Sequence, residues 1–247
     1  MTAGRPAAIL TLVMLMAVVA CRTARPAGNE GPVSPLAAPD RIAAFSELQA
    51  RRAGFTGARS LMRIRATAGD KTQSFRAQLQ VDRAQRMQLT AYTPVGTTAL
   101  TLFADGDRVI FLNAIEQTAW TGSASEFARS FGFFGSLAPS EMAMLLLGLP
   151  ARSAPDAKVL DAGTFGGGKG LIYDVTPTGL SQASIETDDD LVVVHYDPPA
   201  QPPQHVSVDH GAEKLEIEHL EIATSDAVLS WPGIPSSYRC CVVPRLQ

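Results

Sequence analysis

Runs of alternating apolar and polar residues flank a short loop in the first half of the chain. Residues 74–82 and 86–92 alternate before the loop, and residues 99–103 and 108–112 are again strand-like after it. A period of two is typical of strands with one buried face. In the loop, Pro94 fixes a backbone angle and Gly96 can adopt a positive φ. Val95 lies between them without a local partner, so the tip either folds back on the core or faces a lipid or a partner.

Turn residues divide the chain into about twelve short strands. Six are expected in the first half, at residues 61–67, 72–82, 87–91, 98–104, 108–112 and 118–121. Six more are expected at residues 158–162, 170–176, 180–188, 191–197, 204–209 and 213–223. This pattern predicts a mainly β fold with inserted helices, built as a half-open antiparallel β-barrel of 11–12 strands.

Three segments follow the helical period instead. The first covers residues 39–52 with Asp40 as a plausible N-cap, and the second covers residues 123–131 with Ser123 or Ser125 as its cap. The third covers residues 139–147 and is apolar nearly all round. Such a helix must be buried or must cover something apolar. Core packing is the simpler expectation for each residue, whereas methionine and phenylalanine in quantity also suit apolar ligands of variable shape.

The chain begins with a short targeting segment. Arg5 precedes an apolar run, residues 7–20, that is too short to span a bilayer comfortably, so residues 1–20 are expected to be a signal peptide. The run ends in Val18-Val19-Ala20-Cys21, which has the form of a lipobox. We therefore expect Cys21 to be acylated (diacylglycerol and a further acyl chain such as palmitate), which anchors the mature protein to a membrane. The alternative is a secretory signal with a chance cysteine.

Arg22 occupies the position where an aspartate retains lipoproteins in the inner membrane of enteric bacteria. Its presence favours the periplasmic face of the outer membrane. Residues 21–39 are rich in Ala, Pro and Gly and are expected to form a flexible tether. The β domain is expected at residues 40–223, and residues 224–247 form a C-terminal tail that either closes the barrel or hangs free.

Composition narrows the choice of partner. The whole chain carries a net charge of −3, and loss of residues 1–20 with Arg5 gives −4, so there is no basic balance for nucleic acid. Charged residues make up 18% of the chain, against about 25% in typical proteins. The chain therefore has much apolar surface to bury or to use.

Candidate chemical motifs are weak. Residues 166–169, Gly-Gly-Gly-Lys, lack the spacing of a phosphate-binding loop, and no Gly-x-Ser-x-Gly elbow is present. The histidines lack short metal-ligand spacing, residues 188–190 are three consecutive aspartates that suit a solvated turn, and the adjacent Cys240 and Cys241 make a poor metal site. We expect no metal, no cofactor and no enzymatic activity.

Several of these features together resemble the LolB family of outer-membrane lipoprotein receptors, structural relatives of the periplasmic carrier LolA. They are the loop of residues 93–98 (Thr-Pro-Val-Gly-Thr-Thr), the hairpin at residues 105–107, the helical insert and the helix end at residues 145–150 (Leu-Leu-Leu-Gly-Leu-Pro). The element order extends over residues 40–223, and the tail with Trp231 has no counterpart.

The resemblance implies a helical lid over an apolar cavity that receives acyl chains from a LolA-like carrier. The family's protruding loop bears an exposed leucine that works at the membrane, and Pro94, Val95 and Gly96 match that loop, with the smaller valine in place of leucine. Candidates for lining the cavity are Phe75, Leu79, Leu89, Phe103, Phe127, Phe131, Met142, Leu145 and Leu146. Arg63 and Arg65 either face solvent, as we expect, or hold the lid, as an inward arginine does in the carrier.

The function implied is transfer of acylated lipoproteins from the carrier into the outer membrane by a monomeric protein. A non-catalytic envelope scaffold is the alternative, and its cavity would be filled by its own side chains. A lipid-modifying enzyme would need a nucleophile with a base in reach, and the sequence shows no such pair.

Overall fold

The computed structural model describes residues 38–131, 137–152, 158–161, 164–166, 170–186 and 191–240. The first half of the chain contributes the following elements: α2 (Ala38–Ala53), β1 (Gly57–Ala68), β2 (Lys71–Asp82), β3 (Met87–Tyr92), β4 (Thr98–Asp105), β5 (Arg108–Asn113), β6 (Thr118–Ser123), α3 (Ala124–Phe131) and α4 (Pro139–Leu146). The second half contributes these strands: β7 (Lys158–Asp161), β8 (Thr164–Gly166), β9 (Leu171–Thr176), β10 (Gly179–Glu186), β11 (Leu191–Tyr196), β12 (His205–His210), β13 (Glu213–Thr224) and β14 (Arg239–Cys240).

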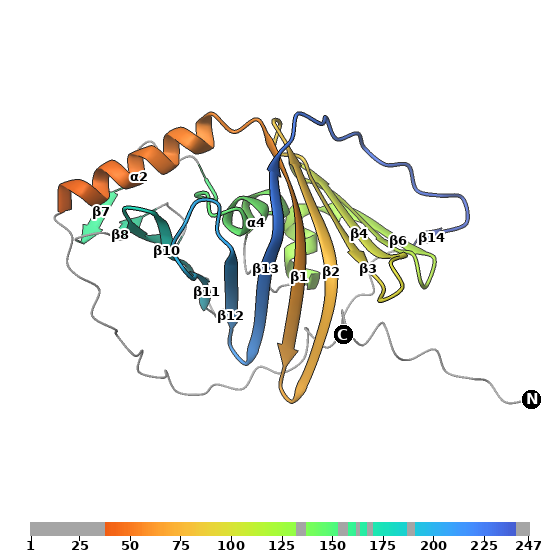
Figure 1. The fold of residues 1–247 in the computed structure, drawn as a ribbon. Coiled ribbons are helices and arrows are strands. Elements are labelled where there is room, and N and C mark those ends of the chain that lie inside the picture. Colours follow the sequence, from red (N-terminus) through yellow and green to blue (C-terminus); the bar gives the residue numbers. More distant parts are fainter. Residues whose placement is uncertain are drawn as a thin grey trace, which may run out of the picture.

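All fourteen strands of the described part belong to one sheet, in the order β14-β6-β5-β4-β3-β2-β1-β13-β12-β11-β10-β9-β8-β7. Neighbouring strands are antiparallel except β14, which runs parallel to β6. The long strands β1, β2 and β13 form the middle of the sheet, and the strands on either side curve away from them (Figure 1). The sheet does not close, because β14 and β7 stand at opposite ends of the order.

The expectation of a mainly β, open antiparallel fold with inserted helices is confirmed. Twelve of the fourteen strands match the twelve expected segments, and the two additional ones, β8 and β14, have three and two residues. Strands of that length are too short to show a period of two in the sequence. The first strand begins at Gly57, four residues earlier than the apolar pattern indicated.

Cross-strand register separates the two faces of the first half-sheet. Leu79, Leu89, Leu102, Phe111 and Trp120 are successive partners across β2 to β6 and lie on the inner, concave face. The adjacent row on the outer face consists of Gln80, Gln88, Phe103, Ile110 and Thr121. The register separates the two rows because successive side chains of a strand point to opposite faces, and the packing of Leu79, Leu102 and Trp120 into the core identifies the inner row.

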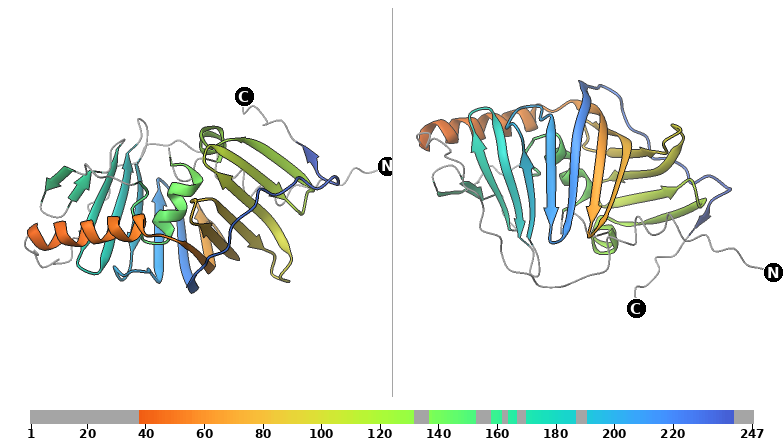
Figure 2. Two further views of the ribbon diagram at one scale, coloured as in Figure 1. Left: turned by 90° about the horizontal axis from the view of Figure 1, so that it is seen from above. Right: turned by 60° about the horizontal axis from the view of Figure 1, so that its bottom comes forward.

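Two helices lie against the sheet in different ways. Helix α2 lies along one side of the molecule against β9 and β10, where Phe45 meets the ring of Tyr173 at a centroid distance of 5.8 Å. Helix α4 lies within the curve of the sheet, between the strands of its two halves (Figure 2). Its position makes α4 the element around which both halves of the sheet pack.

Residues 225–240, which we term the C-terminal strap, cross the outer face of the first half-sheet (Figure 2). Trp231 of the strap contacts Phe103 edge to face, with ring centroids 5.2 Å apart, and the guanidinium of Arg108 lies 4.0 Å from its ring centroid. The backbone N–H of the buried Leu229 donates to Asp82 Oδ2 at 3.1 Å. The strap therefore packs on the sheet, and its final residues add β14 to the edge strand β6.

None of the helices in the described ranges combines the length and the apolar character needed to cross a bilayer.

Candidate functional site

Helix α4 has start and stop signals that are visible in its sequence. Pro139 occupies the first turn, and the carboxylate of Glu141 accepts a hydrogen bond from the backbone N–H of Ala138 at 2.9 Å. At its end, Gly148 has φ 73°, the Gly148 N–H donates to Leu145 O at 2.8 Å, and the Leu149 N–H donates to Met144 O at 2.9 Å. These two backbone hydrogen bonds around a left-handed glycine form a Schellman motif, which ends the helix in a buried setting.

Three side chains from the second half of the chain bind the carbonyl groups at the end of α4. The hydroxyl of Tyr196 donates to Leu145 O at 2.9 Å, His219 Nε2 lies 3.0 Å from Leu146 O, and Gln201 Nε2 donates to Leu147 O at 3.1 Å. The last carbonyls of a helix lack partners within the helix, and a buried carbonyl without a partner is costly. These three bonds therefore fasten α4 to the sheet.

Ser60 on β1 orients the histidine of this group. Ser60 Oγ lies 2.7 Å from His219 Nδ1, and both side chains are buried. Because Nε2 must carry a proton to donate to Leu146 O, Nδ1 accepts the proton of the serine hydroxyl. Burial lowers the pKa of His219 to about 4, so the ring is neutral at pH 7. Burial also raises the pKa of Tyr196 well above its ordinary value, so its hydroxyl stays a donor.

The other side of α4 is fixed through an ion pair. Arg152, which follows the helix, forms a salt bridge with Glu141, and its Nη2 donates to Glu141 Oε2 at 2.9 Å. The hydrogen bond with Glu141 raises the pKa of Arg152. Next to Arg152, the backbone N–H of Ala151 donates to the hydroxyl of Tyr173 on β9 at 2.9 Å. Both ends of α4 are thus fastened by polar contacts.

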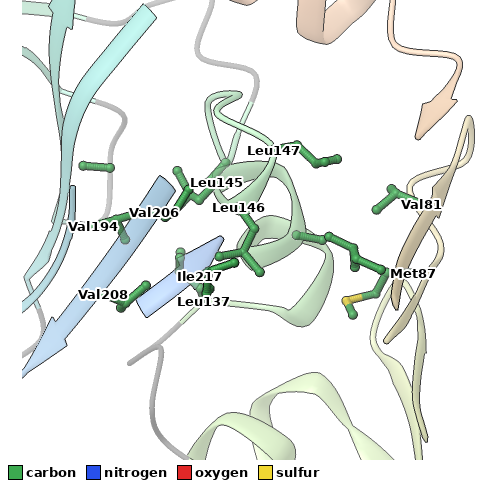
Figure 3. Packing of buried hydrophobic residues seen from close by; sticks show 14 of the residues in the cluster. Val81, Met87, Leu137, Leu145, Leu146, Leu147, Val194, Val206, Val208 and Ile217 are labelled. Carbon is green, nitrogen blue, oxygen red and sulfur yellow. The ribbon is translucent and has the colours of Figure 1, made fainter. Parts of the chain in front are cut away.

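Between these contacts, α4 presents an apolar surface to both halves of the sheet. Leu145, Leu146 and Leu147 are at most 3% exposed. Figure 3 shows these leucines between two groups of sheet residues, with Val194, Val206, Val208 and Ile217 on one side and Val81 and Met87 on the other. Apart from the polar groups that bind the end of α4, the side chains between α4 and the concave face are apolar.

Most of the residues expected to line a cavity lie in this region. Leu79, Met142, Leu145 and Leu146 are buried, while Phe75, Leu89 and Phe127 are half-buried and pack against the same core. Phe127 on α3 meets Trp120 with ring centroids 5.9 Å apart. The side chain of Phe131, the other candidate on α3, lies outside the described residues.

The expectation that Phe103 lines the concave face is wrong. Phe103 pairs with Ile110 in the outer row, is 0% exposed and contacts Trp231 of the strap. The apolar run of β4, Leu102-Phe103-Ala104, is buried on both faces, so its pattern did not show which residue points inward. Only the strap, which covers the outer face here, explains why Phe103 is apolar.

The loop between β3 and β4 forms a hydrogen-bonded turn that projects from the sheet. The Gly96 N–H donates to Thr93 O at 2.9 Å, the Thr93 N–H donates to Thr97 O at 2.8 Å, and the two threonine hydroxyls lie 2.8 Å apart. Gly96 has φ 86°, the left-handed conformation that follows a type I turn in such hairpins. Pro94 is exposed, and Val95 is 84% exposed, so the tip does not fold back on the core.

Arg63 and Arg65 face solvent, as expected. They pair with Glu218 at 2.6 Å and Glu216 at 3.8 Å on the outer face of β13. The polar groups that hold α4 are instead Tyr196, Gln201 and His219, and the sequence analysis did not identify them. One signal was present, because His219 follows Leu215 and Ile217 at the inward positions of β13, and a polar residue on a buried face usually has a specific partner.

The remaining sequence candidates give no site in the described ranges. No group of three or more metal-binding side chains occurs there. Cys240 is an exposed free thiol on β14, and Cys21, residues 167–169, residues 188–190 and Cys241 lie outside the described residues. Ser60 and His219 do form a hydroxyl–imidazole pair, but the second ring nitrogen faces a backbone carbonyl of α4 rather than a carboxylate.

Comparison with known proteins identifies the fold but no family. No protein-family model matches the chain, and no curated protein matches its sequence. Among solved structures, an outer membrane lipoprotein-sorting protein domain from Vibrio parahaemolyticus superposes with a TM-score of 0.51 at 9% identity, over 78% of this chain and 95% of that one. A LolA superfamily protein from Nitrosomonas europaea matches 78% of this chain and 96% of its own with a TM-score of 0.46 at 10% identity.

At these identities the likeness shows the fold alone. The protein shares the open, curved antiparallel sheet of the Vibrio parahaemolyticus domain. On this fold the chain carries the apolar helix α4, fastened at its last carbonyls, and the exposed Val95 tip.

Proposed function

We propose that this protein is a LolB-like lipid-anchored receptor of the outer membrane, which accepts acylated lipoproteins from a LolA-like periplasmic carrier and inserts them into the membrane. The observation that carries the proposal is helix α4, whose apolar side chains occupy the concave face of the sheet. We infer that α4 is a lid, and that acyl chains of the cargo replace its side chains against the same apolar strands.

The free energy gained by burying an acyl chain and the free energy gained by burying the α4 side chains are of the same order. Shielding one acyl chain of about 15 carbons from water contributes roughly 12 kcal/mol, at ~0.8 kcal/mol per CH₂ group. Helix α4 and the residue after it bury Met142, Met144, Leu145, Leu146 and Leu147. At about 1.5–3 kcal/mol for each buried side chain, their burial contributes roughly 10 kcal/mol. A nearly balanced exchange suits a receptor, because cargo must be released as well as bound.

The hydrogen bonds to α4 fit a lid that opens and closes. Water can replace Tyr196, Gln201 and His219 as partners of the helix carbonyls once α4 leaves the sheet, so opening loses only the small net contribution of each bond, about 1 kcal/mol. The apolar contacts set the strength of closure, whereas the three polar contacts fix its position.

The acylated Cys21 near the N-terminus and the loop with Val95 would make the contacts with the membrane. Acylated Cys21 would hold the domain at the outer membrane through the tether of residues 22–37. The Val95 tip is apolar, 84% exposed and held by the Thr93–Thr97 hydrogen bonds. A rigid apolar tip can enter the bilayer surface without an ordering cost at the moment of contact. No chemical step is needed for this transfer, and we propose none.

The direct test is transfer of cargo. The mature acylated protein in phospholipid vesicles is mixed with a carrier loaded with a triacylated lipoprotein, reisolated and analysed by mass spectrometry. We expect the cargo to move from the carrier to the vesicles through a complex with this protein. Absence of transfer to correctly folded protein, as judged by circular dichroism, would contradict the proposal.

Replacement of Val95 by Glu separates cargo binding from insertion. Because the side chain is exposed, we expect unchanged stability and cargo binding but at least tenfold slower insertion. Val228 is 78% exposed on the strap, so Val228→Glu is a matched control that should leave insertion unchanged. Equal insertion by the Val95→Glu variant and the wild type would refute the role of the tip.

A scaffold function is the second candidate, and one observation favours it. The scaffold hypothesis expects the concave face to be filled by the protein's own side chains, and the leucines of α4 do lie there (Figure 3). A scaffold would keep α4 in place, so the transfer experiment distinguishes the two functions.

A further inference from the structure

We propose that the turn between β5 and β6, with Ile115 at its apex, is a second contact with the phospholipid bilayer beside the Val95 tip. This inference rests on the proposed function, in which the Val95 tip works at the membrane. It assigns a role to a turn that the sequence analysis did not single out.

The two turns lie on the same rim of the sheet. Strands β3 and β5 both run toward this rim, and the Ala114 N–H donates to Ala99 O at 2.9 Å, which places the second turn beside the start of β4. In Figure 1 both turns lie at the lower right, at the ends of β3–β4 and of β5–β6. Val95 is 84% exposed and Ile115 is 44% exposed, so this rim carries two large apolar side chains in water.

The second turn is held in shape as firmly as the first. Asn113 Oδ1 accepts hydrogen bonds from the backbone N–H groups of Ile115 at 3.1 Å and Glu116 at 3.0 Å. Gln117 then takes a left-handed conformation with φ 53°, which leads the chain into β6. A side-chain oxygen that binds two successive N–H groups fixes the loop and keeps Ile115 at its apex.

A tyrosine and an arginine lie near the base of each of the two turns. Tyr92 and Arg76 are cross-strand partners at the base of the Val95 tip. The strap brings Tyr238 and Arg239 to the other turn, where the Arg239 N–H donates to Gln117 O at 2.8 Å. Tyrosine and arginine are residue types that occupy the boundary between acyl chains and headgroups, with the apolar part inward and the polar end in water.

The length of the tether limits how far the rim can lie from the acylated cysteine. The lipobox cysteine, Cys21, precedes α2 by 17 residues, since α2 begins at Ala38. A chain of that length spans at most about 58 Å when fully extended. Because α2 begins on the side of the molecule away from the two turns, this inference requires an extended tether for acylated Cys21 and the rim to share one bilayer (Figure 1).

The test places a fluorophore at each apex. The mature acylated protein carries Cys240→Ser and Cys241→Ser together with one of Val95→Cys, Ile115→Cys or Val228→Cys, each labelled with an environment-sensitive nitrobenzoxadiazole group. Vesicles contain phosphatidylethanolamine and phosphatidylglycerol, and iodide quenching measures exposure to water. We expect positions 95 and 115 to be quenched at least fivefold less than position 228, with emission shifted to the blue.

The outcomes separate this inference from the proposed function. If iodide quenches the label at position 115 as strongly as the label at position 228, while the label at position 95 is protected, the second contact is refuted. The proposed receptor function is not affected by that result. Quenching at both apices overturns it as well, and the cargo transfer measured with the unlabelled wild-type protein then decides the receptor function alone. In unlabelled protein, we expect Ile115→Glu to slow insertion about tenfold and Ile115→Leu to preserve it, with both variants folded by circular dichroism.

Discussion

Replacement of His219 by Gln should remove a large part of the acid sensitivity of this fold. The imidazole is 9% exposed, receives the Ser60 hydroxyl at Nδ1 and donates from Nε2 to the Leu146 carbonyl. A protonated ring would carry a charge in this apolar setting, and the positive charge of nearby His205 would add repulsion at acid pH. Glutamine keeps an N–H for the Leu146 carbonyl and does not titrate.

The sign and size of the effect follow from the two pKa values. Burial lowers the pKa of His219 to about 4, whereas a free histidine has a pKa of 6.5. Below pH 6.5 the unfolded chain therefore binds a proton that the folded protein does not, and the free energy of unfolding falls as the pH falls. Integration from pH 7.5 to pH 5 gives a loss of about 2 kcal/mol, and the loss levels off near pH 4.

The measurement is urea unfolding followed by circular dichroism at pH 7.5, 6 and 5, for the wild type and the His219→Gln variant. Every other titratable group is common to both proteins, so the difference between their pH dependences isolates His219. We expect the variant to lose about 2 kcal/mol less than the wild type between pH 7.5 and 5. Parallel pH profiles for the two proteins would refute the neutral, buried state of His219.

Three further substitutions test the packing around α4 and the strap. Tyr196→Phe removes a hydroxyl that donates to Leu145 O and should lower the free energy of unfolding by about 1 kcal/mol in urea, the net contribution of one hydrogen bond, because this carbonyl keeps its bond from the Gly148 N–H; an unchanged midpoint would contradict this. Gly148→Ala should lower the free energy of unfolding, measured by calorimetry, more than Gly69→Ala does. Both glycines have a positive φ, but only at Gly148 would an added Cβ lie 2.8 Å from atoms of Gln201 and Pro203. Equal losses of stability would argue against close packing at Gly148. Trp231→Ala should release the strap and speed its cleavage by proteases within residues 225–240, whereas wild-type cleavage rates would show that Trp231 does not hold it.

The alternating pattern was sufficient to predict most strands because each has one buried face. In β2 from Phe75 to Val81 and in β12, the apolar residues are more buried than the polar residues between them. The same logic located α3, where Ser123 caps the helix: its Oγ accepts the Glu126 N–H at 3.2 Å, and Glu126 Oε2 accepts the Ser123 N–H at 2.8 Å. Local hydrogen bonds and local periodicity fix such elements, so no distant residue is needed to recognise them.

The candidate site was predicted only in part, because its polar contacts join distant segments. The sequence indicated the apolar character of α4, but not that Tyr196 and His219 bind its last carbonyls across 51 and 73 residues. Similarly, the outward position of Phe103 depends on a strap that begins more than 100 residues later. Contacts at such separations have no signature in local periodicity.

The sequence by itself determined the mainly β character of the domain and the positions of its turns and helix ends, including the turn at residues 94–96, since each depends on neighbouring residues. Only the tertiary structure decided that α4 lies between the two halves of the sheet, that His219 is a buried neutral donor, and that Ile115 shares a rim with Val95. These features arise from the curvature and register of a fourteen-stranded sheet, which bring together side chains that the linear chain keeps far apart.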